Sequence, residues 1–338
     1  MNHYFAVTFR GLERVAATEI EQIRGCRVAE VAYRRVAFSF SGKPARLLSL
    51  RTVDDLFLTV GQWAEIGHTR SALDSLRRAA TETDLQPAAA LCGRLRYLPE
   101  RPDVSLTVNF IGKRNFNTAE IKQALAAGFA HSHPWHFDRP DSEAQLNVRL
   151  FIEHQQALVG VRLAGSPLWR RPYRATTLPG ALKPPVAAAL VRLAGRPRTD
   201  LLLDPYCGSG TILAEASGLG WAVSGGDVDS QAVQTARQTM LACGATGPVA
   251  RWDAAALPLP DASVDGLVSN LPWGHQVERP DSLPPLLAEI GRVVKPGGRV
   301  VLLTEQPQSL AIPGFRRLEG FEISLAGKRP IVVIYEAV

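Results

Sequence analysis

The 338-residue sequence lacks the features that mark several large classes of protein. No run approaches the roughly 18 consecutive apolar residues that a membrane-spanning helix needs. No basic and apolar N-terminal segment precedes a small-residue cleavage site, so we expect a cytoplasmic protein with no membrane partner. The four cysteines form no Cys-x-x-Cys pair, which argues against both a zinc site and a disulfide framework.

What is present is the composition of a globular protein with an uneven distribution of charge. Hydrophobic residues make up 46% of the chain and charged residues 21%, and the length predicts two or three domains. Residues 1–175 carry 24 Lys and Arg against 17 Asp and Glu, a net charge of +7, whereas residues 176–338 carry 14 against 15, a net charge of −1. Because phosphate binding needs clustered cations, the first half is predicted to bind nucleic acid; the alternative is a basic domain without that role.

The turn that follows the apolar residues 201–203 is the first sign of a ligand site. Asp204 ends the apolar run, Gly208 and Gly210 permit a tight turn and close approach of a ligand, and Thr211 is placed to cap the next helix. Strand, glycine turn and helix in this order form the first half of a nucleotide-binding βαβ unit. Helix–strand packing also uses glycines, so the turn alone leaves a structural role open.

Carboxylates end the next two apolar segments. Asp227 lies 23 positions after Asp204, where a carboxylate hydrogen-bonds ribose hydroxyls in this architecture. Capping of the following helix is the alternative for Asp227 and the expected role of Asp229. Asp253 lies in a polar turn, where its carboxylate is placed to accept a hydrogen bond from an adenine amine.

The strand at residues 264–269 ends in Asn270-Leu271-Pro272-Trp273, which resembles the Asn-x-Pro-aromatic motif of S-adenosylmethionine-dependent amino methyltransferases. The resemblance implies that the Asn270 oxygen and the Leu271 carbonyl accept hydrogen bonds from the amine, while Pro272 fixes the turn. It also implies that Trp273 stacks on a base rotated out of its helix. The commoner motif has proline and Tyr or Phe at positions 271 and 273; leucine keeps the backbone carbonyl. Adenine and cytosine amines are alternative targets of such a motif.

The same resemblance implies which residues bind S-adenosylmethionine. They are Asp204, Pro205, Cys207, Gly208, Ser209, Gly210 and Thr211 for the methionine part, Asp227 and Val228 for the ribose, Asp253 and Ala254 for the adenine, and Asn270 beside the methyl group.

The N-terminal half shows a second resemblance. Residues 1–60 follow the order βαββαβ of a ferredoxin-like sheet. The next hundred residues contain a cationic and aromatic turn, a helix that starts with the capping box of Asn117 and Glu120, a strand pair, and a terminal Arg-rich segment. This order resembles a THUMP domain preceded by a ferredoxin-like module, and the predicted RNA-binding residues are Lys113, Arg114, Phe116, Arg170, Arg171 and Arg174.

Three histidines in one short segment need a separate interpretation. His131, His133 and His136 are potential metal ligands, but Pro134 indicates a loop. We predict a solvent-exposed or RNA-facing loop and no metal centre.

Together these patterns predict an α/β protein with a C-terminal Rossmann-like methyltransferase sheet and an N-terminal α+β module. The predicted segments are a ferredoxin-like domain (1–60), a THUMP domain (61–165), a linker (166–182) and a methyltransferase domain (183–338). The resemblance as a whole is to THUMP-containing tRNA guanine-N2 methyltransferases. It implies methylation of tRNA at acceptor-stem position 6 by a monomer; position 10, ribosomal RNA and a non-catalytic RNA-binding protein are the alternatives.

Overall fold

A computed structural model describes residues 1–174, 176–195, 200–272 and 283–338. The chain divides into two compact units, and each is described here by itself. The first comprises Met1–Val7, Ile20–Leu50 and Asp55–Leu168. The second comprises Trp169–Val338 together with two short pieces of the N-terminal sequence, Thr8–Glu19 and Arg51–Asp54.

The first unit is built on one sheet whose strands follow the order β2-β3-β1-β4-β7-β6-β5. Every pair of neighbours is antiparallel except β5 and β6. The strands are β1 (Asn2–Val7), β2 (Cys26–Ala32), β3 (Arg35–Phe40), β4 (Asp55–Trp63), β5 (Val104–Phe110), β6 (Leu146–Glu153) and β7 (Gln156–Arg162). The helices are α1 (Glu13–Glu21), which continues into this unit from the second, η1 (Pro44–Ser49), α2 (Ala72–Glu82), α3 (Gln86–Gly93) and α4 (Thr118–Ser132).

The order β2-β3-β1-β4 is that of a ferredoxin-like sheet, as the βαββαβ pattern predicted, with the second helix a 3-10 turn. Strand β4 also pairs with β7, so the sheet continues from the ferredoxin-like strands into the region predicted as a THUMP domain. The boundary at residue 60 therefore falls within a strand, and the division into separate domains stays a prediction. The helix predicted at Thr118 begins there, and both hydrogen bonds of its capping box are formed.

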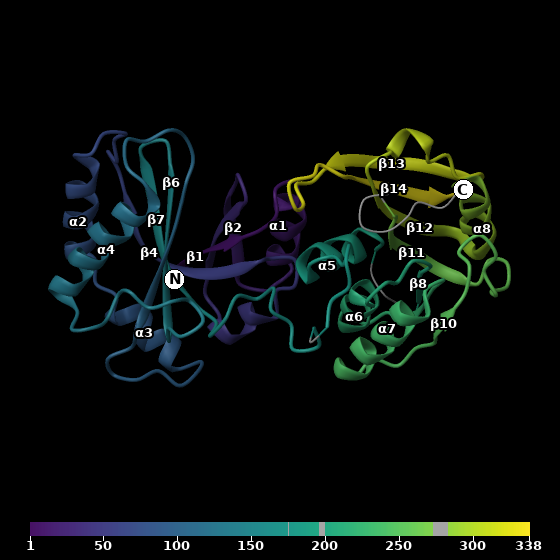
Figure 1. Ribbon diagram of the computed structural model, residues 1–338, viewed down its shortest axis with the longest axis horizontal. Helices are drawn as coiled ribbons and strands as arrows, with labels where there is room; N and C mark the ends of the chain where they lie inside the picture. Colours follow the sequence, from purple (N-terminus) through teal and green to yellow (C-terminus); the bar gives the residue numbers. More distant parts are fainter. Residues whose placement is uncertain (175, 196–199, 273–282) are drawn as a thin grey trace. The chain divides into compact units, whose positions relative to one another are not determined.

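The second unit contains a seven-stranded sheet of order β10-β9-β8-β11-β12-β14-β13 (Figure 1). Strands β8 to β12 run parallel, and β14 is antiparallel to both of its neighbours. The strands are β8 (Leu201–Asp204), β9 (Ala222–Asp227), β10 (Val249–Arg251), β11 (Val264–Asn270), β12 (Val294–Thr304), β13 (Phe315–Glu322) and β14 (Ile331–Ala337). The helices are α5 (Pro184–Leu193), α6 (Thr211–Gly218), α7 (Ser230–Ala242), α8 (Leu283–Val293) and η2 (Pro307–Ser309).

This strand order confirms the predicted Rossmann-like sheet and locates its binding edge. The chain proceeds from β8 to β9 and β10 in one direction, then crosses back to β11 and β12 on the other side of β8. The direction of winding therefore reverses between β8 and β11. Open parallel sheets bind ligands at the carboxyl ends of the strands next to such a switch point.

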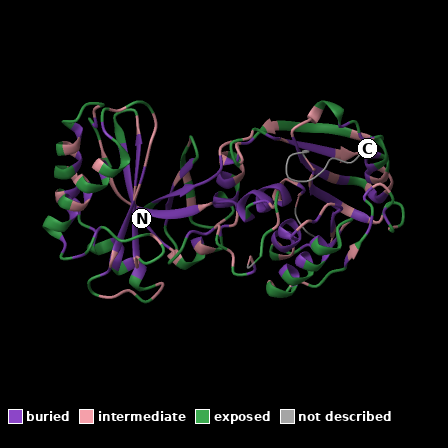
Figure 2. Cartoon of the chain, viewed as in Figure 1, coloured by how far each residue is buried: buried purple, intermediate pink, exposed green. Residues whose placement is uncertain are grey.

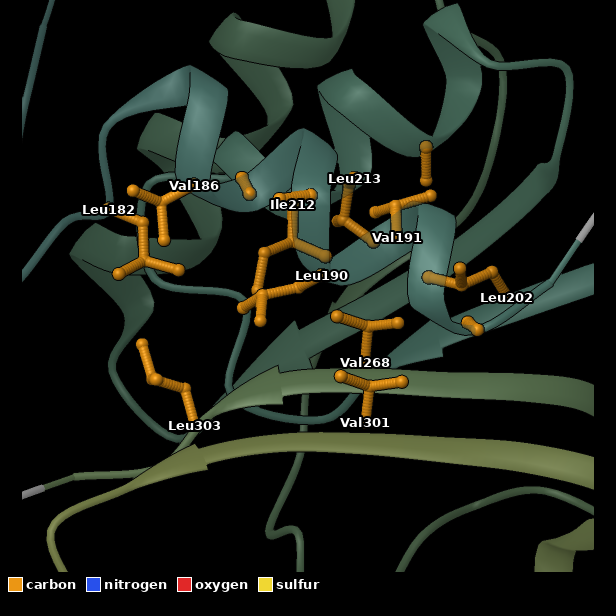
Figure 3. Packing of buried hydrophobic residues seen from close by; sticks show 14 of the residues in the cluster. Leu182, Val186, Leu190, Val191, Leu202, Ile212, Leu213, Val268, Val301 and Leu303 are labelled. Carbon is orange, nitrogen blue, oxygen red and sulfur yellow. The ribbon is translucent and has the colours of Figure 1, made fainter. Parts of the chain in front are cut away.

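Apolar packing fixes the position of the strands at this switch point. Helices α5 and α6 lie on one face of the sheet, where Leu190 and Ile212 pack with Val268 and Val301 (Figure 3). Residues 184–191 of α5 are all buried, so this helix is enclosed on every side (Figure 2). Among the described residues, no helix is both long and apolar enough to cross a membrane.

Candidate active site

The glycine turn after β8 has the backbone geometry that the sequence pattern predicted. Gly208 and Gly210 adopt positive φ angles of 49° and 78°, which side chains rarely allow. A Cβ on Gly210 would lie 3.0 Å from the Cα of Ala236, so this glycine permits α6 and α7 to pack closely. A Cβ on Gly208 would meet no described atom within 4 Å, so this glycine faces open space. Gly208 is therefore the glycine of the turn that suits approach of a ligand.

Helix α6 begins one residue earlier than the predicted cap implies. Gly210 is its N-cap residue and Thr211 its first helical residue, so the prediction that Thr211 caps the helix is wrong. Gly210 has no side chain to accept a hydrogen bond from the first turn. The first N–H groups of a helix lack partners within it and carry a partial positive charge, which suits an anion such as a carboxylate.

Asp204 is buried at the end of β8, with 1% of its surface exposed. Its Oδ1 accepts hydrogen bonds from the Ser269 hydroxyl at 2.8 Å and from the Tyr206 N–H at 3.2 Å. Both donors are neutral. Burial raises the pKa of Asp204 to about 7, and the nearby charge of Asp227 acts in the same direction.

Asp227 ends β9 next to the glycine turn. Its Oδ2 accepts a hydrogen bond from the Gly208 N–H at 3.0 Å, and its Oδ1 accepts one from the Asp229 N–H at 3.1 Å. The neighbouring Val228 exposes 60% of its surface, which is unusual for an apolar side chain at a strand end. The Asp229 side chain accepts a hydrogen bond from the Gln231 N–H, which confirms that Asp229 caps α7.

The third carboxylate of this edge follows β10. Asp253 is exposed and accepts a hydrogen bond from the Ala255 N–H at 2.9 Å, whereas the adjacent Ala254 is buried. Burial, followed by the charges of Asp253 and Asp227, raises the pKa of Tyr206 to about 12. The tyrosine therefore lies close to both carboxylates.

Asn270 ends β11, immediately after the serine that binds Asp204. Its Nδ2 donates to the Gly180 carbonyl at 3.4 Å. Its Oδ1 is buried and has no hydrogen-bond partner among the described residues. Buried polar atoms are nearly always hydrogen-bonded, so within the described residues this oxygen is an acceptor still available to a ligand.

The structure describes two of the three remaining residues of the Asn-Leu-Pro-Trp motif, Leu271 and Pro272. The Leu271 N–H donates to the Leu303 carbonyl at 3.0 Å, and its side chain is buried in an apolar cluster. A proline at position 271 could not make this hydrogen bond. Pro272 is half-buried, and Trp273 lies outside the described residues.

The arrangement fits S-adenosylmethionine. The N-terminus of α6 suits its carboxylate, and the Asp227 and Asp253 carboxylates suit ribose hydroxyls and an adenine amine. Open space beside Gly208 leaves room for the ligand to approach the backbone. Cys207 and Ser209 are buried within the turn, and burial raises the pKa of the Cys207 thiol well above its usual range, so this thiol is a packing group.

The predicted RNA-binding residues of the first unit differ in their surroundings. Lys113 is exposed. Arg114 donates to the carbonyls of Gly67 and His154, and its guanidinium lies over the ring of Phe116, which is only 4% exposed. Arg114 and Phe116 thus help to build the turn, and Lys113 is the residue in it whose charge faces solvent.

The three arginines of the linker also differ. Arg170 is exposed and lies over the ring of Trp169, and Arg174 is half-buried. The Arg171 side chain is only 12% exposed, and its Nε donates to the buried carboxylate of Glu215 at 3.0 Å. RNA binding by these residues stays a prediction, and Arg170 is the best placed for it.

The histidine segment contains a buried residue that we expected to be exposed. His133 is 3% exposed, its Nε2 accepts a hydrogen bond from the Leu85 N–H at 3.0 Å, and its ring lies against Trp135. Helix α4 also continues to Ser132, so the loop starts later than predicted. Within the described part of the chain, no group of three or more His, Cys, Asp or Glu side chains forms a metal site.

Three residues of the site were not predicted from the sequence: Tyr206, Ser269 and Gly180. Tyr206 and Ser269 adjoin predicted residues, and that adjacency was the only available signal. Gly180 is 90 positions from Asn270, and a Pro-Gly pair predicts a turn without indicating what its carbonyl contacts.

Comparisons with known proteins match both units. Residues 171–312 match a family model described as RMKL-like, methyltransferase domain. The chain is 33% identical, over 98% of both lengths, to tRNA (guanine(6)-N2)-methyltransferase of Thermus thermophilus. The crystal structure of TrmN from Thermus thermophilus matches it with a TM-score of 0.80 and 28% identity over 100% of both chains. Ribosomal RNA large subunit methyltransferase K/L of Photobacterium profundum is 30% identical over 64% of this chain, which spans 29% of that protein.

Proposed function

Because the chain belongs to the family of THUMP-containing guanine-N2 methyltransferases, we propose that it methylates the N2 amine of guanine at position 6 of tRNA. The structural observation that carries the chemistry is the unused acceptor of Asn270, which lies at the switch point of the sheet next to the glycine turn. The full-length similarity to an enzyme named for position 6 supports that position over position 10 and over ribosomal RNA.

The geometry suits an amine that is a poor nucleophile. The lone pair of the guanine N2 atom is delocalised into the ring. The Asn270 Oδ1 and the Leu271 carbonyl oxygen each accept one of the two N–H groups, which lets the nitrogen pyramidalise and directs its lone pair away from the ring plane. S-adenosylmethionine, when bound, supplies an electrophilic methyl group on a sulfonium. Positioning and electrostatic complementarity then provide most of the rate acceleration.

The proton balance requires no strong base in the site. As the N–C bond forms, the nitrogen gains positive charge and its proton becomes acidic enough to pass to water. Asn270 is neutral throughout and only accepts a hydrogen bond. Asp204 stays buried behind Ser269, so it supports the cofactor side of the site and does not take the proton.

The first unit and the linker are proposed to bind the tRNA backbone. The net charge of +7 on residues 1–175 and the exposed side chains of Lys113 and Arg170 support this assignment. Binding that depends on phosphates weakens steeply with salt, so a flat response of tRNA affinity to salt would contradict it. We further propose that Trp273 stacks on the extruded guanine and that the enzyme acts as a monomer.

The experiment is transfer of labelled methyl groups from S-adenosylmethionine to unmodified bulk tRNA, with nucleoside mass analysis. N2-methylguanosine is expected, and Asn270→Ala is expected to lower kcat by about 10² to 10³ because it removes one of the acceptors. Asn117→Ala is the matched control. It removes a helix cap of α4 in the other unit, which lowers stability by about 1 kcal/mol and should leave kcat unchanged.

Mapping then decides between the alternatives. A tRNA whose guanine at position 6 is replaced should lose all labelling, whereas replacement at position 10 should change nothing. Label found on adenosine or cytidine would overturn the assignment of guanine N2 as the methylated atom. Methyl transfer to ribosomal RNA and not to tRNA would favour ribosomal RNA as the substrate. Binding of S-adenosylmethionine without methyl transfer to any RNA would favour a non-catalytic RNA-binding protein.

A further inference from the structure

A rigid turn in the linker contacts the catalytic amide. The Ala181 N–H donates to the Leu178 carbonyl at 3.1 Å, and Gly180 adopts a φ of 76°. Pro179 and Gly180 are the residues that a type II turn requires at its two central positions. The Gly180 carbonyl is therefore held in a fixed orientation, and it accepts the hydrogen bond from Asn270 Nδ2.

This contact decides which way the Asn270 amide points. If the amide were reversed, its oxygen would face the Gly180 carbonyl oxygen at the same separation, and the two partial negative charges would repel. The Gly180 carbonyl therefore selects the orientation in which Oδ1 is directed elsewhere. In that orientation Oδ1 is buried with no partner among the described residues, ready to accept a hydrogen bond from an amine.

The same linker is anchored at its other end to the cofactor helix. Glu215 on α6 is fully buried, and its Oε1 accepts from the Tyr173 hydroxyl at 2.5 Å and from Arg171 Nε at 3.0 Å. Its Oε2 accepts from Arg51 Nε at 2.6 Å. Removing one partner from a buried, hydrogen-bonded ion pair is costly, so this cluster is a specific attachment.

The helix that carries the anchor is the one that starts at the glycine turn. Thr211 is its first residue, and Glu215 lies about one turn further along. The linker therefore leaves α6 at Tyr173 and reaches Asn270 at Gly180. These two attachments join the element that faces the cofactor to the amide that faces the substrate.

We infer that the described residues of the linker, 171–174 and 176–181, are a positioning device for methyl transfer, in which Glu215 anchors the linker and the Gly180 carbonyl orients the Asn270 amide. The inference rests on the proposed function for its catalytic consequence. Tyr173, Glu215 and Gly180 are positioning residues in this inference, because they act through Asn270.

Two variants weaken the device at its two ends. Tyr173→Phe removes one hydroxyl from the Glu215 cluster and keeps the aromatic ring. Gly180→Ala strains the turn at its positive φ angle. Each is expected to lower kcat about ten-fold, the value of one well-placed hydrogen bond, while the KM for tRNA and the Kd for S-adenosylmethionine change by less than about two-fold.

The matched control is Tyr335→Phe in the same unit. The Tyr335 hydroxyl donates to the Leu310 carbonyl at 2.6 Å, so this variant loses a buried tyrosine hydrogen bond that is not part of the linker. Its melting temperature should fall about as far as that of Tyr173→Phe while kcat stays at the wild-type value. An equal loss of kcat in both tyrosine variants would overturn the inference, as would a cofactor Kd that rises as much as kcat falls.

A second measurement needs no turnover. The side-chain amide signals of Asn270 in a ¹⁵N-labelled sample are identified by their loss in Asn270→Ala. They should shift in Tyr173→Phe and in Gly180→Ala and stay in place in Tyr335→Phe; unshifted signals in the two linker variants would overturn the inference. If wild-type enzyme fails to methylate tRNA, the proposed function fails, and these signals still decide whether the linker orients the amide.

Discussion

Two carboxylates of the methyltransferase unit are buried almost completely, yet their surroundings are opposite. Glu215 is bound by two guanidinium groups and a tyrosine hydroxyl. Asp204 is bound by a serine hydroxyl and a backbone N–H, and no described cation contacts it. The first has its charge compensated by the protein, and the second does not.

The difference suits a structural role for Glu215 and the proposed cofactor-binding role for Asp204. Compensation lets Glu215 hold the linker. Burial without a cation raises the pKa of Asp204 to about 7, which means that the fold retains an unfavourable group at the edge where β8 meets β11. Proteins keep such groups mainly where a ligand or a reaction uses them. We propose that bound S-adenosylmethionine, which carries cationic ammonium and sulfonium groups, compensates part of this charge.

Removal of the compensated charge should have the largest effect on stability. Glu215→Gln removes the buried carboxylate that the half-buried Arg51 and Arg171 share, and breaking a buried pair in this way costs about 3 to 5 kcal/mol of unfolding free energy. Urea denaturation measures the loss. Glu336→Gln is the control, because its ion pair with Arg316 lies at the surface and contributes about 0 to 1 kcal/mol. Equal losses in the two variants would remove the distinction drawn here.

Removal of the uncompensated charge of Asp204 should change stability in the opposite direction and raise the free energy of unfolding. The folded-state pKa of Asp204, about 7, exceeds the unfolded value of about 3.9, so the folded protein holds this proton more tightly. The resulting destabilisation is absent below about pH 4, grows between pH 4 and 7, and is complete above pH 7. Each pKa unit corresponds to about 1.4 kcal/mol, so a difference of about three units makes the full penalty roughly 4 kcal/mol.

Asp204→Asn is therefore expected to be more stable than wild type at pH 8 and nearly equal to it at pH 4. The same change should weaken S-adenosylmethionine binding, because the cofactor loses a carboxylate partner. Thermal melts at the two pH values and calorimetric titration measure the two effects. A variant that is less stable than wild type at pH 8 would show that Asp204 is structural in the way Glu215 is.

The sequence predicted the site where chain order alone determines proximity. The carboxyl ends of neighbouring parallel strands meet at one edge, so Asp204, Asp227, Asp253 and Asn270 follow from recognising each strand end. The ferredoxin-like order follows in the same way from the succession of elements.

Contacts between distant segments were not predictable. Arg170 and Arg171 are neighbours of identical type, and only the fold places one over the ring of Trp169 and the other against Glu215, 44 positions away. The continuation of the N-terminal sheet through β4 and β7 depends on a pairing across about a hundred residues. Pairings of this kind are set by packing in three dimensions, so local sequence patterns do not predict them.

The smallest of the three effects concerns Leu271. Its backbone N–H donates a hydrogen bond within the sheet, whereas the neighbouring Asn270 oxygen has no partner among the described residues. Leu271→Pro creates the commoner form of the motif but loses the N–H donated to Leu303 and leaves that carbonyl unsatisfied, at a cost of about 1 to 3 kcal/mol. Because only the backbone carbonyl of this residue is proposed to contact the amine, kcat should stay within about three-fold of wild type once the protein is folded. Urea denaturation and methyl transfer at a temperature where both proteins are folded test this together. A loss of kcat as large as that of Asn270→Ala would mean that the leucine side chain, and not the carbonyl alone, shapes the site.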